Sequence, residues 1–340
     1  MLLTILTKFP RSRRTNGRYM LAPIAWVLFG MLALSRVVSP TAPALTMTMP
    51  HPAVDQADIA DEPTVAPEDP IVDTAVTVPP TSTTVQPRKP RRISRGALFS
   101  DLRQPLNLND WRISTHTNAH AGAFYGGPWV SENIIPQHDR LVLKVVAGKN
   151  GERPTMAEMQ SNRKYRYGRY EVIMRPSDAR GVVSAFFTYT GPATGDPHDE
   201  VDIEFAGNRS QAVEYNYWNN KRKGAFSREG LDFDFSERMN LYAFEWHPDE
   251  IIWYVNGEEH YRSPRDRSRI PSNPGNIFIS AWTGIPATYE WTSAPDFEDS
   301  TQSEFACVSF TPFEDASYSC ADLFAEDDQF QADQSDLSAD

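Results

Sequence analysis

Three acidic residues alternate along one short segment of the chain. Residues 198–205 read HDEVDIEF, so that Glu200, Asp202 and Glu204 are two positions apart. Successive side chains of a β-strand point to opposite faces, and the three carboxyl groups therefore share one face. Like charges at short range raise at least one carboxyl pKa, which keeps one group protonated near neutral pH. A carboxylic acid beside a carboxylate is the pair that retaining glycoside hydrolysis requires.

Two other interpretations of this segment remain open. Alternating residues ordinarily indicate a strand with a solvent-facing polar side, but such a side normally includes Lys or Arg, which this acidic face lacks. A metal site is the second alternative, with His198, Glu200 and Asp202 as ligands of Ca²⁺ or a transition ion. No facing ligand segment is evident in the sequence, and we expect no catalytic metal.

The elements that position this segment are predicted to be β-strands. Short runs rich in β-branched and aromatic residues are bounded by Gly, Pro, Asn or Asp, and no long window has a helical apolar period. Asn256 and Gly257 lie between two such runs and predict a β-hairpin. We expect an all-β sandwich or barrel. The expected strands are 111–117, 141–147, 165–175, 182–190, 200–205, 213–218, 242–247, 251–255, 277–282 and 305–310.

The segments outside this β region are predicted to serve export and tethering. A positive stretch and an apolar run predict a signal peptide or an N-terminal membrane anchor over residues 1–44. Residues 19–38 are the only part expected to contact a membrane, and only if the segment is not cleaved. Clustered Pro and Thr predict a disordered linker over 45–95, and Asp and Gln an acidic disordered tail over 321–340. The folded domain is expected over 96–320, in a secreted or extracytoplasmic protein.

Charge and cysteine content exclude other classes of protein. The formal net charge of −12 argues against a nucleic-acid partner, because phosphate binding needs clustered Lys and Arg. Two cysteines are too few for a disulfide-dense scaffold or a Cys-rich zinc module. Cys307 and Cys320 follow the last predicted strands and are suited to close a short loop in an oxidising compartment.

Seven runs of the sequence resemble the family 16 glycoside hydrolases, most closely the bacterial lichenases (endo-β-1,3-1,4-glucanases) and related β-glucan depolymerases. They lie between residues 157 and 284, and their order and spacing agree over most of the expected domain. The resemblance implies a concanavalin-like jelly-roll β-sandwich with an open sugar-binding cleft. The runs read AEMQS, YGRYEVIMRPS, GVVSAFFTYTGP, HDEVDIEFAGN, YNYW, YAFEWHPDEIIWYVNGE and PGNIFISAWTG.

The resemblance also implies roles for single residues. Glu200 matches the nucleophile, Glu204 the acid/base and Asp202 the assisting carboxylate. His198 stands where lichenases usually have Trp and where xyloglucan transglycosylases have His. Trp282 and Trp291 flank a loop and, if exposed, suit stacking on sugar rings. The residues expected to hold substrate are Glu158, Tyr189, His198, Asn216, Trp218, Trp282 and Trp291.

We therefore expect a monomeric, retaining endo-β-glycanase that hydrolyses a polysaccharide, either mixed-linkage 1,3-1,4-glucan or a succinoglycan-like polymer. The reaction needs no cofactor, and a structural calcium ion is compatible with the resemblance although the sequence has no EF-hand loop. Transglycosylation from the same covalent intermediate is the alternative among enzymes. A non-catalytic carbohydrate-binding β-sandwich is the alternative of another class, but such proteins tend to lose the carboxylates that this chain keeps.

Overall fold

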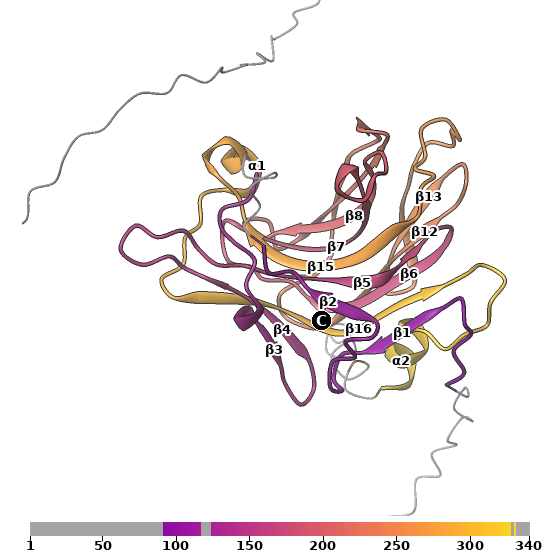
Figure 1. Cartoon of the computed structure of the whole chain (residues 1–340), viewed down its shortest axis with the longest axis horizontal. Coiled ribbons are helices and arrows are strands. Elements are labelled where there is room, and N and C mark those ends of the chain that lie inside the picture. The colour runs from indigo at the N-terminus through magenta and orange to yellow at the C-terminus, as the bar shows by residue number, and fades with distance from the viewer. Residues whose placement is uncertain (1–90, 117–123, 328–329, 331–340) are drawn as a thin grey trace, which may run out of the picture. The chain divides into compact units, whose positions relative to one another are not determined.

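Two antiparallel β-sheets pack face to face in the structure, a computed structural model that describes residues 91–116, 124–327 and 330 (Figure 1). One sheet, here the site sheet, has the strand order β10-β9-β8-β7-β15-β5-β2, with β11 also paired to β9. Its strands are β2 (Trp111–Ile113), β5 (Ala157–Tyr165), β7 (Val182–Thr190), β8 (Asp199–Ala206), β9 (Ala212–Asn219), β10 (Arg222–Lys223), β11 (Ser227–Gly230) and β15 (Gly275–Thr283).

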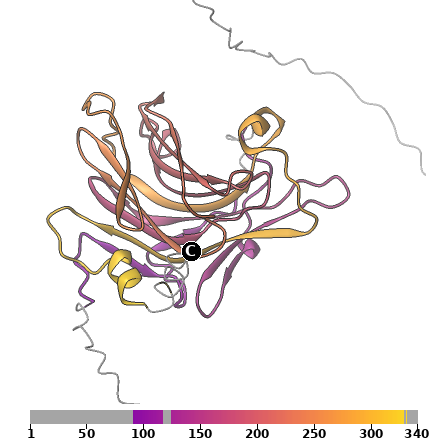
Figure 2. The same ribbon diagram turned by 180° about the vertical axis from the view of Figure 1, so that it is seen from behind.

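The other sheet, here the outer sheet, has the order β14-β13-β12-β6-β16-β4-β3, and β1 also pairs with β16. The site sheet curves so that the face turned away from the outer sheet is concave, in both views (Figures 1 and 2). The strands of the outer sheet are β1 (Leu98–Asp101), β3 (Ile134–Pro136), β4 (Leu141–Val146), β6 (Gly168–Arg175), β12 (Asn240–Trp246), β13 (Ile251–Val255), β14 (Glu258–Arg262) and β16 (Ser300–Thr311).

The hydrophobic core lies between the sheets and follows from the alternation along each strand. Val201, Ile203 and Phe205 of β8 are fully buried. The Phe205 ring lies 4.6 Å from that of Tyr242 on β12, between ring centroids. Burying one face of β8 in this way leaves its alternate residues on the concave face. The predicted all-β sandwich is confirmed.

Helices are short in the described residues. Helix α1 (Tyr289–Thr292) follows β15 and the 3₁₀ turn Pro286–Thr288, and α2 (Cys320–Glu326) follows β16. Two further 3₁₀ turns occupy Ser131–Asn133 and Pro192–Thr194. No helix in these ranges has the length and apolarity needed to cross a membrane.

Strand boundaries depart from the sequence prediction at several places. The strands expected at 182–190 and 251–255 are found with those bounds, whereas β5 was not predicted. Near the end of β5, Asn162, Arg163 and Lys164 are all exposed. Three consecutive polar residues interrupt the alternation of apolar and polar residues from which a strand is predicted. The strand expected at 165–175 covers the last residue of β5 and all of β6, which are separate strands in the structure. Strand β16 begins five residues before its predicted start.

The predicted disordered tail is wrong for residues 321–326, which belong to α2. Leu323 and Phe324 are buried against Ile173 of β6 and Leu241 of β12, on the outward side of the outer sheet. An apolar pair within an acidic segment therefore provides enough contact to order it. Phe330, which follows α2, is also buried and belongs to the same hydrophobic cluster.

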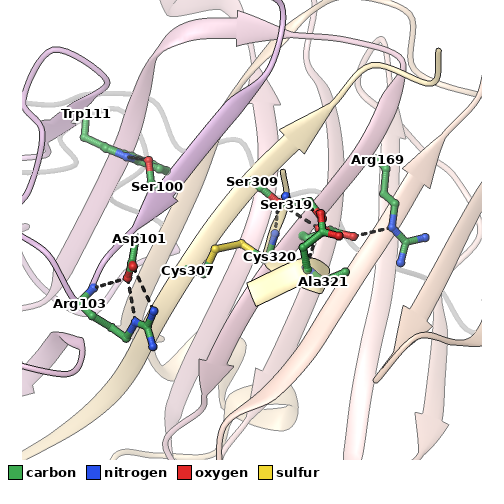
Figure 3. Close-up of a disulfide and its surroundings, with 12 residues drawn as sticks. Ser100, Asp101, Arg103, Trp111, Arg169, Cys307, Ser309, Ser319, Cys320 and Ala321 are labelled. Atoms are coloured by element: carbon green, nitrogen blue, oxygen red, sulfur yellow. Dashed lines mark hydrogen bonds and ion pairs between the residues drawn. A yellow bond between two sulfur atoms is a disulfide. The ribbon is translucent and has the colours of Figure 1, made fainter. Parts of the chain in front are cut away.

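A disulfide fixes α2 to the outer sheet. Cys320 at the start of the helix is bonded to Cys307 of β16 (Figure 3). Beside it, the carboxylate of buried Glu171 accepts hydrogen bonds from the Ala321 backbone N–H at 3.1 Å and from the Ser309 hydroxyl at 3.0 Å. The sequence left open whether the two cysteines pair; they do, and the domain extends beyond residue 320.

The last residues of the predicted linker also belong to the folded part. The Ser94 backbone N–H donates to the Ser317 hydroxyl at 2.9 Å, and the Tyr318 N–H donates to the Arg92 carbonyl at 2.9 Å. The prediction of disorder up to residue 95 is wrong for these residues, because they pair with the segment that leads into α2. The predicted export segment and most of the predicted linker and tail lie outside the described residues.

Candidate active site

The three alternating carboxyl groups lie side by side on the concave face of β8. This follows from the burial of the intervening residues and from the register of the neighbouring strands. Glu200, Asp202 and Glu204 form successive rows with residues of β7 and β9. The rows are Tyr189–Glu200–Trp218, Phe187–Asp202–Asn216 and Ala185–Glu204–Glu214.

The surroundings of these carboxyl groups favour their protonated forms. Burial, followed by the charges of Glu200 and Glu204, raises the pKa of Asp202 well above its ordinary value. Burial, followed by the charges of Glu200 and Glu214, raises the pKa of Glu204 to about 8. Lys223 opposes both shifts. One strand thus carries a carboxylic acid that keeps its proton at neutral pH next to a second carboxyl group.

His198 contacts the first carboxyl group directly. Its Nε2 lies 2.5 Å from Oε2 of Glu200. The imidazole stacks on Trp218 with 5.2 Å between ring centroids and an interplanar angle of 18°, and the ring of Tyr189 also lies 5.2 Å from it. The structure therefore brings four of the predicted residues together at one end of the carboxylate row.

Asn216 and Glu158 lie on the same concave face. Asn216 is buried beside Asp202, and its Oδ1 has no hydrogen-bond partner among the described residues. Glu158 of β5 accepts a hydrogen bond from the Ser114 hydroxyl at 2.7 Å, and burial raises its pKa to about 7. Asn216 lies on β9, next to the carboxylate strand, whereas Glu158 is separated from that strand by β15 and β7.

Aromatic rings gather at the other end of the row, near Glu204. Trp282 lies 5.6 Å from Trp291 and 5.4 Å from Phe124, between ring centroids. Trp282 is only 3% exposed, so the expectation that it presents an exposed ring is wrong. Phe124, which is 40% exposed and packs over it, presents an exposed face instead.

Tyr125 is a site residue that the sequence did not reveal. Burial raises its pKa well above the ordinary value, and the charges of Glu158, Glu200, Glu204 and Asp202 raise it further. Its ring lies 5.0 Å from that of Trp282. Tyr125 makes only an isolated bridge to Gly284, outside any regular strand, so no alternation pointed to it.

Glu214 is a second site residue that was missed. It is 1% exposed and lies opposite Glu204 on β9. Its Oε1 accepts hydrogen bonds from Arg209 Nη2 at 2.9 Å and Arg228 Nε at 2.8 Å, and its Oε2 accepts one from Trp291 Nε1 at 2.5 Å. Its position two residues before Asn216 was a usable signal, because alternation places both on one face.

Comparison with known proteins identifies the family. The sequence model described as "Glycosyl hydrolases family 16" matches residues 127–301. The chain belongs to this family. The resemblance seen in the sequence is thereby confirmed, together with the jelly-roll sandwich that it implied.

Family 16 proteins named for glucan hydrolysis are among the relatives. A beta-glucanase of Acetivibrio thermocellus is 34% identical over 217 residues, which are 64% of this chain and 62% of that protein. A xylanase/beta-glucanase of Ruminococcus flavefaciens is 36% identical over 214 residues, 58% of this chain and only 26% of that protein. The chain thus spans less than two thirds of either relative. A crystal structure of a lichenase from a mouse hindgut metagenome is 33% identical with a TM-score of 0.59, covering 64% of this chain and 99% of that one.

Proposed function

We propose that this family 16 chain is a retaining endo-β-glucanase that hydrolyses β-glucosidic bonds in a polysaccharide. The observation that carries the proposal is the acidic face of β8, where Glu204 has its pKa raised to about 8 two residues from Asp202 and four from Glu200. A solvent-facing strand would leave such groups ionised. A site with a protonated carboxyl group beside a second one suits the two-carboxylate chemistry of glycosidases.

Glu200 acts as the nucleophile and Glu204 as the acid and base in this proposal. In the first step a Glu200 oxygen bonds to the anomeric carbon while the glycosidic bond breaks, and the Glu204 proton passes to the leaving oxygen. In the second step water attacks the anomeric carbon, Glu204 takes its proton, and the bond to Glu200 breaks. Asp202 lies between the two on β8 and assists by its position.

Substrate recognition is proposed to use the groups that flank the carboxylate row. Tyr189 and Trp218 lie at the Glu200 end, and Trp291 and exposed Phe124 at the Glu204 end. Aromatic faces suit the apolar faces of sugar rings. The unpaired Oδ1 of buried Asn216 offers an acceptor to a sugar hydroxyl, because a buried polar atom without a partner is costly.

Mixed-linkage β-1,3-1,4-glucan is the proposed substrate, supported by the relatives named beta-glucanase and lichenase. The full chain should be incubated with barley β-glucan, laminarin, xyloglucan and succinoglycan, and the products separated by size. We expect a ladder of oligosaccharides from barley glucan and, by ¹H NMR, an initial β-anomer at the new reducing end. An initial α-anomer would contradict the retaining mechanism.

The same experiment distinguishes the alternatives. Products longer than an added acceptor oligosaccharide would identify a transglycosylase. Binding of the four polymers without any cleavage would identify a carbohydrate-binding sandwich. Cleavage of succinoglycan alone would keep the mechanism and change the substrate.

We further propose that the protein acts outside the cytoplasm. The disulfide between Cys307 and Cys320 supports an oxidising compartment, because structural disulfides are rare where thiols are kept reduced. Whether residues 1–44 are cleaved or remain as an anchor, and the monomeric state, stay predictions.

A further inference from the structure

A histidine and a carboxylate form a close pair at one end of the proposed catalytic row. His198 Nε2 lies 2.5 Å from Glu200 Oε2. The other carboxylate oxygen of Glu200 makes no hydrogen bond within the described ranges of the chain. One oxygen of Glu200 is therefore held by the imidazole and one is left available.

The imidazole is fixed in place by its neighbours. Trp218 stacks nearly parallel to it at 18°, and the ring of Tyr189 also contacts it, at an angle of 59°. Residues 189, 200 and 218 lie in one cross-strand row of the site sheet, so β7, β8 and β9 together define where the ring lies. Contacts with two aromatic rings and with Glu200 restrict the movement of the imidazole away from the carboxylate.

The chemistry of the pair sets the direction of the hydrogen bond. In its proposed role as nucleophile Glu200 is a carboxylate, which only accepts, and this role places the hydrogen on Nε2 of His198. The sequence has His198 where lichenases usually have Trp, and this His is in hydrogen-bond contact with the carboxylate of Glu200.

We propose that His198 is a positioning residue for Glu200, which holds Oε2 so that Oε1 attacks and which assists release of the sugar from the covalent intermediate. The proposal rests on the assignment of Glu200 as the nucleophile. In the glycosyl ester, Oε2 is a neutral carbonyl oxygen that accepts a weak hydrogen bond. As water attacks and the bond between the anomeric carbon and Oε1 breaks, the electron pair returns to the carboxylate, and the bond from Nε2 to Oε2 strengthens.

This sequence of events makes the two steps of the reaction unequally sensitive to His198. Formation of the ester weakens the hydrogen bond, and hydrolysis of the ester restores it. An interaction that is stronger in the transition state than in the preceding state accelerates that step. Loss of the N–H donor should therefore slow ester hydrolysis and leave ester formation much less affected.

The test compares His198→Phe with His198→Gln in the full chain. Phe keeps an aromatic ring beside Tyr189 and Trp218 but has no donor, and Gln supplies an N–H donor without the ring. The substrate is a 2,4-dinitrophenyl β-glycoside of the oligosaccharide that the product ladder identifies, because its leaving group makes ester formation fast. For His198→Phe we expect kcat and KM to fall together, by about tenfold or more, with kcat/KM little changed. His198→Gln should recover most of kcat.

Mass spectrometry of the quenched reaction supplies the second readout. The glycosyl-enzyme should accumulate in His198→Phe and carry its sugar on Glu200. His247→Phe is the matched control, since His247 pairs with Glu245 at 3.2 Å and stacks on Phe313 in the outer sheet, away from the site. It should behave like the wild type. A fall in kcat/KM without accumulated intermediate, or equal kinetics of the Phe and Gln variants, would overturn the proposal.

A measurement independent of turnover separates this proposal from the proposed function. In ¹⁵N NMR of the resting protein, His198 should show a protonated Nε2 with a proton shifted downfield by the short hydrogen bond. That signal should move upfield in Glu200→Ala. An unprotonated Nε2 would overturn the inference even in an active enzyme. A wild-type protein that shows the signal but cleaves no glycan would instead refute the proposed function.

Discussion

Glu204 lies within a group of acidic residues, and its retained proton is the property on which the proposed mechanism depends. Burial and the neighbouring charges of Glu200 and Glu214 raise its pKa to about 8. Glu214 itself is neutralised by two arginines, which lets a buried carboxylate remain on the same face. The raised pKa of Glu204 thus results from burial and from acidic residues on both β8 and β9 rather than from a single partner.

Removal of the acid should affect substrates unequally. We predict that Glu204→Ala slows hydrolysis of β-glucan by roughly 10²–10⁴-fold, because its leaving oxygen needs a proton. The burst of dinitrophenolate from an activated aryl glycoside should change little, since that group departs without one. Stopped-flow absorbance measures the burst, and reducing-sugar release measures the polymer. Equal defects on both substrates would show that Glu204 is not the acid.

The pH dependence of the first step should follow the same proton. Because the protonated form of Glu204 is active, kcat/KM on β-glucan should be maintained through neutral pH and fall as the pH rises through about 8. The burst on the aryl glycoside should lack this alkaline limb. If kcat/KM instead fell near pH 4.3, the ordinary pKa of a glutamic acid, the site would not retain the proton.

Stability should depend on pH with the sign that this shift dictates. The folded state binds the Glu204 proton more strongly than the unfolded state does, since burial raises the pKa from 4.5 to about 8. The contribution is therefore complete below pH 4.5 and is lost as the pH rises to about 8. We predict that Glu204→Gln, which stays neutral, has a Tm above the wild type at pH 8 and closer to it at pH 5. Calorimetry at both pH values tests this, and a smaller gain at pH 8 would contradict it.

The sequence located the proposed catalytic row because alternation along a strand is a local property. The positions of Glu200, Asp202 and Glu204 on one face required only the period of an extended chain. Glu214 lies on β9, two residues before Asn216, and could have been found by the same alternation, but that signal was not used. Tyr125 was beyond reach, because a loop residue is placed by contacts between distant segments.

At the scale of elements, helix α1 is held over the Glu204 end by one ion-pair network. Arg209 Nη2 donates both to Glu214 Oε1 at 2.9 Å and to the Trp291 carbonyl at 3.0 Å. The Trp291 indole donates to the other oxygen of Glu214. A helix of four residues has little stability of its own, so these bonds fix the position of Trp291.

Loss of this network should weaken substrate binding more than chemistry. We predict that Arg209→Ala raises KM for β-glucan several-fold with a smaller change in kcat, because Trp291 loses its fixed position while the carboxylates keep theirs. The control is Arg262→Ala, which removes an arginine paired with Glu250 on the outer sheet. Its kinetics should match those of the wild type. A normal KM in Arg209→Ala would mean that Trp291 does not contact substrate.

The predictability of elements differed with their environment. Strands β7 and β13, which are largely buried, matched the sequence prediction at both ends. Strand β5, which pairs with β2, was missed because residues 162–164 near its end are polar and exposed. Helix α2 was taken for part of a disordered tail because its charge concealed the two apolar residues that dock it. Composition averaged over a segment cannot show which of its residues find a partner.

At the scale of the whole domain, the disulfide and the proposed active site belong to different sheets. Cys307 lies on β16 of the outer sheet, and its partner Cys320 is 13 residues further along the sequence. Closing a loop of this size contributes about 3 kcal/mol in the chain-entropy account. We predict that Cys307→Ser with Cys320→Ser lowers Tm by about 6–12 °C and leaves kcat unchanged. Thermal unfolding and assays at 25 °C test this, and lost activity in a folded variant would link the two sheets.

The position of β16 within the outer sheet determines when that sheet can be completed during synthesis. Among the described residues β16 is the last strand in sequence, yet it lies between β6 and β4 and also pairs with β1. Residues near position 100 therefore find their hydrogen-bond partners only when residues near position 310 emerge from the ribosome. Closure of such distant pairs is slow and comes late. The outer sheet therefore stays incomplete until residues near position 310 have been made, and an incompletely folded chain is what a membrane translocation channel requires of its cargo.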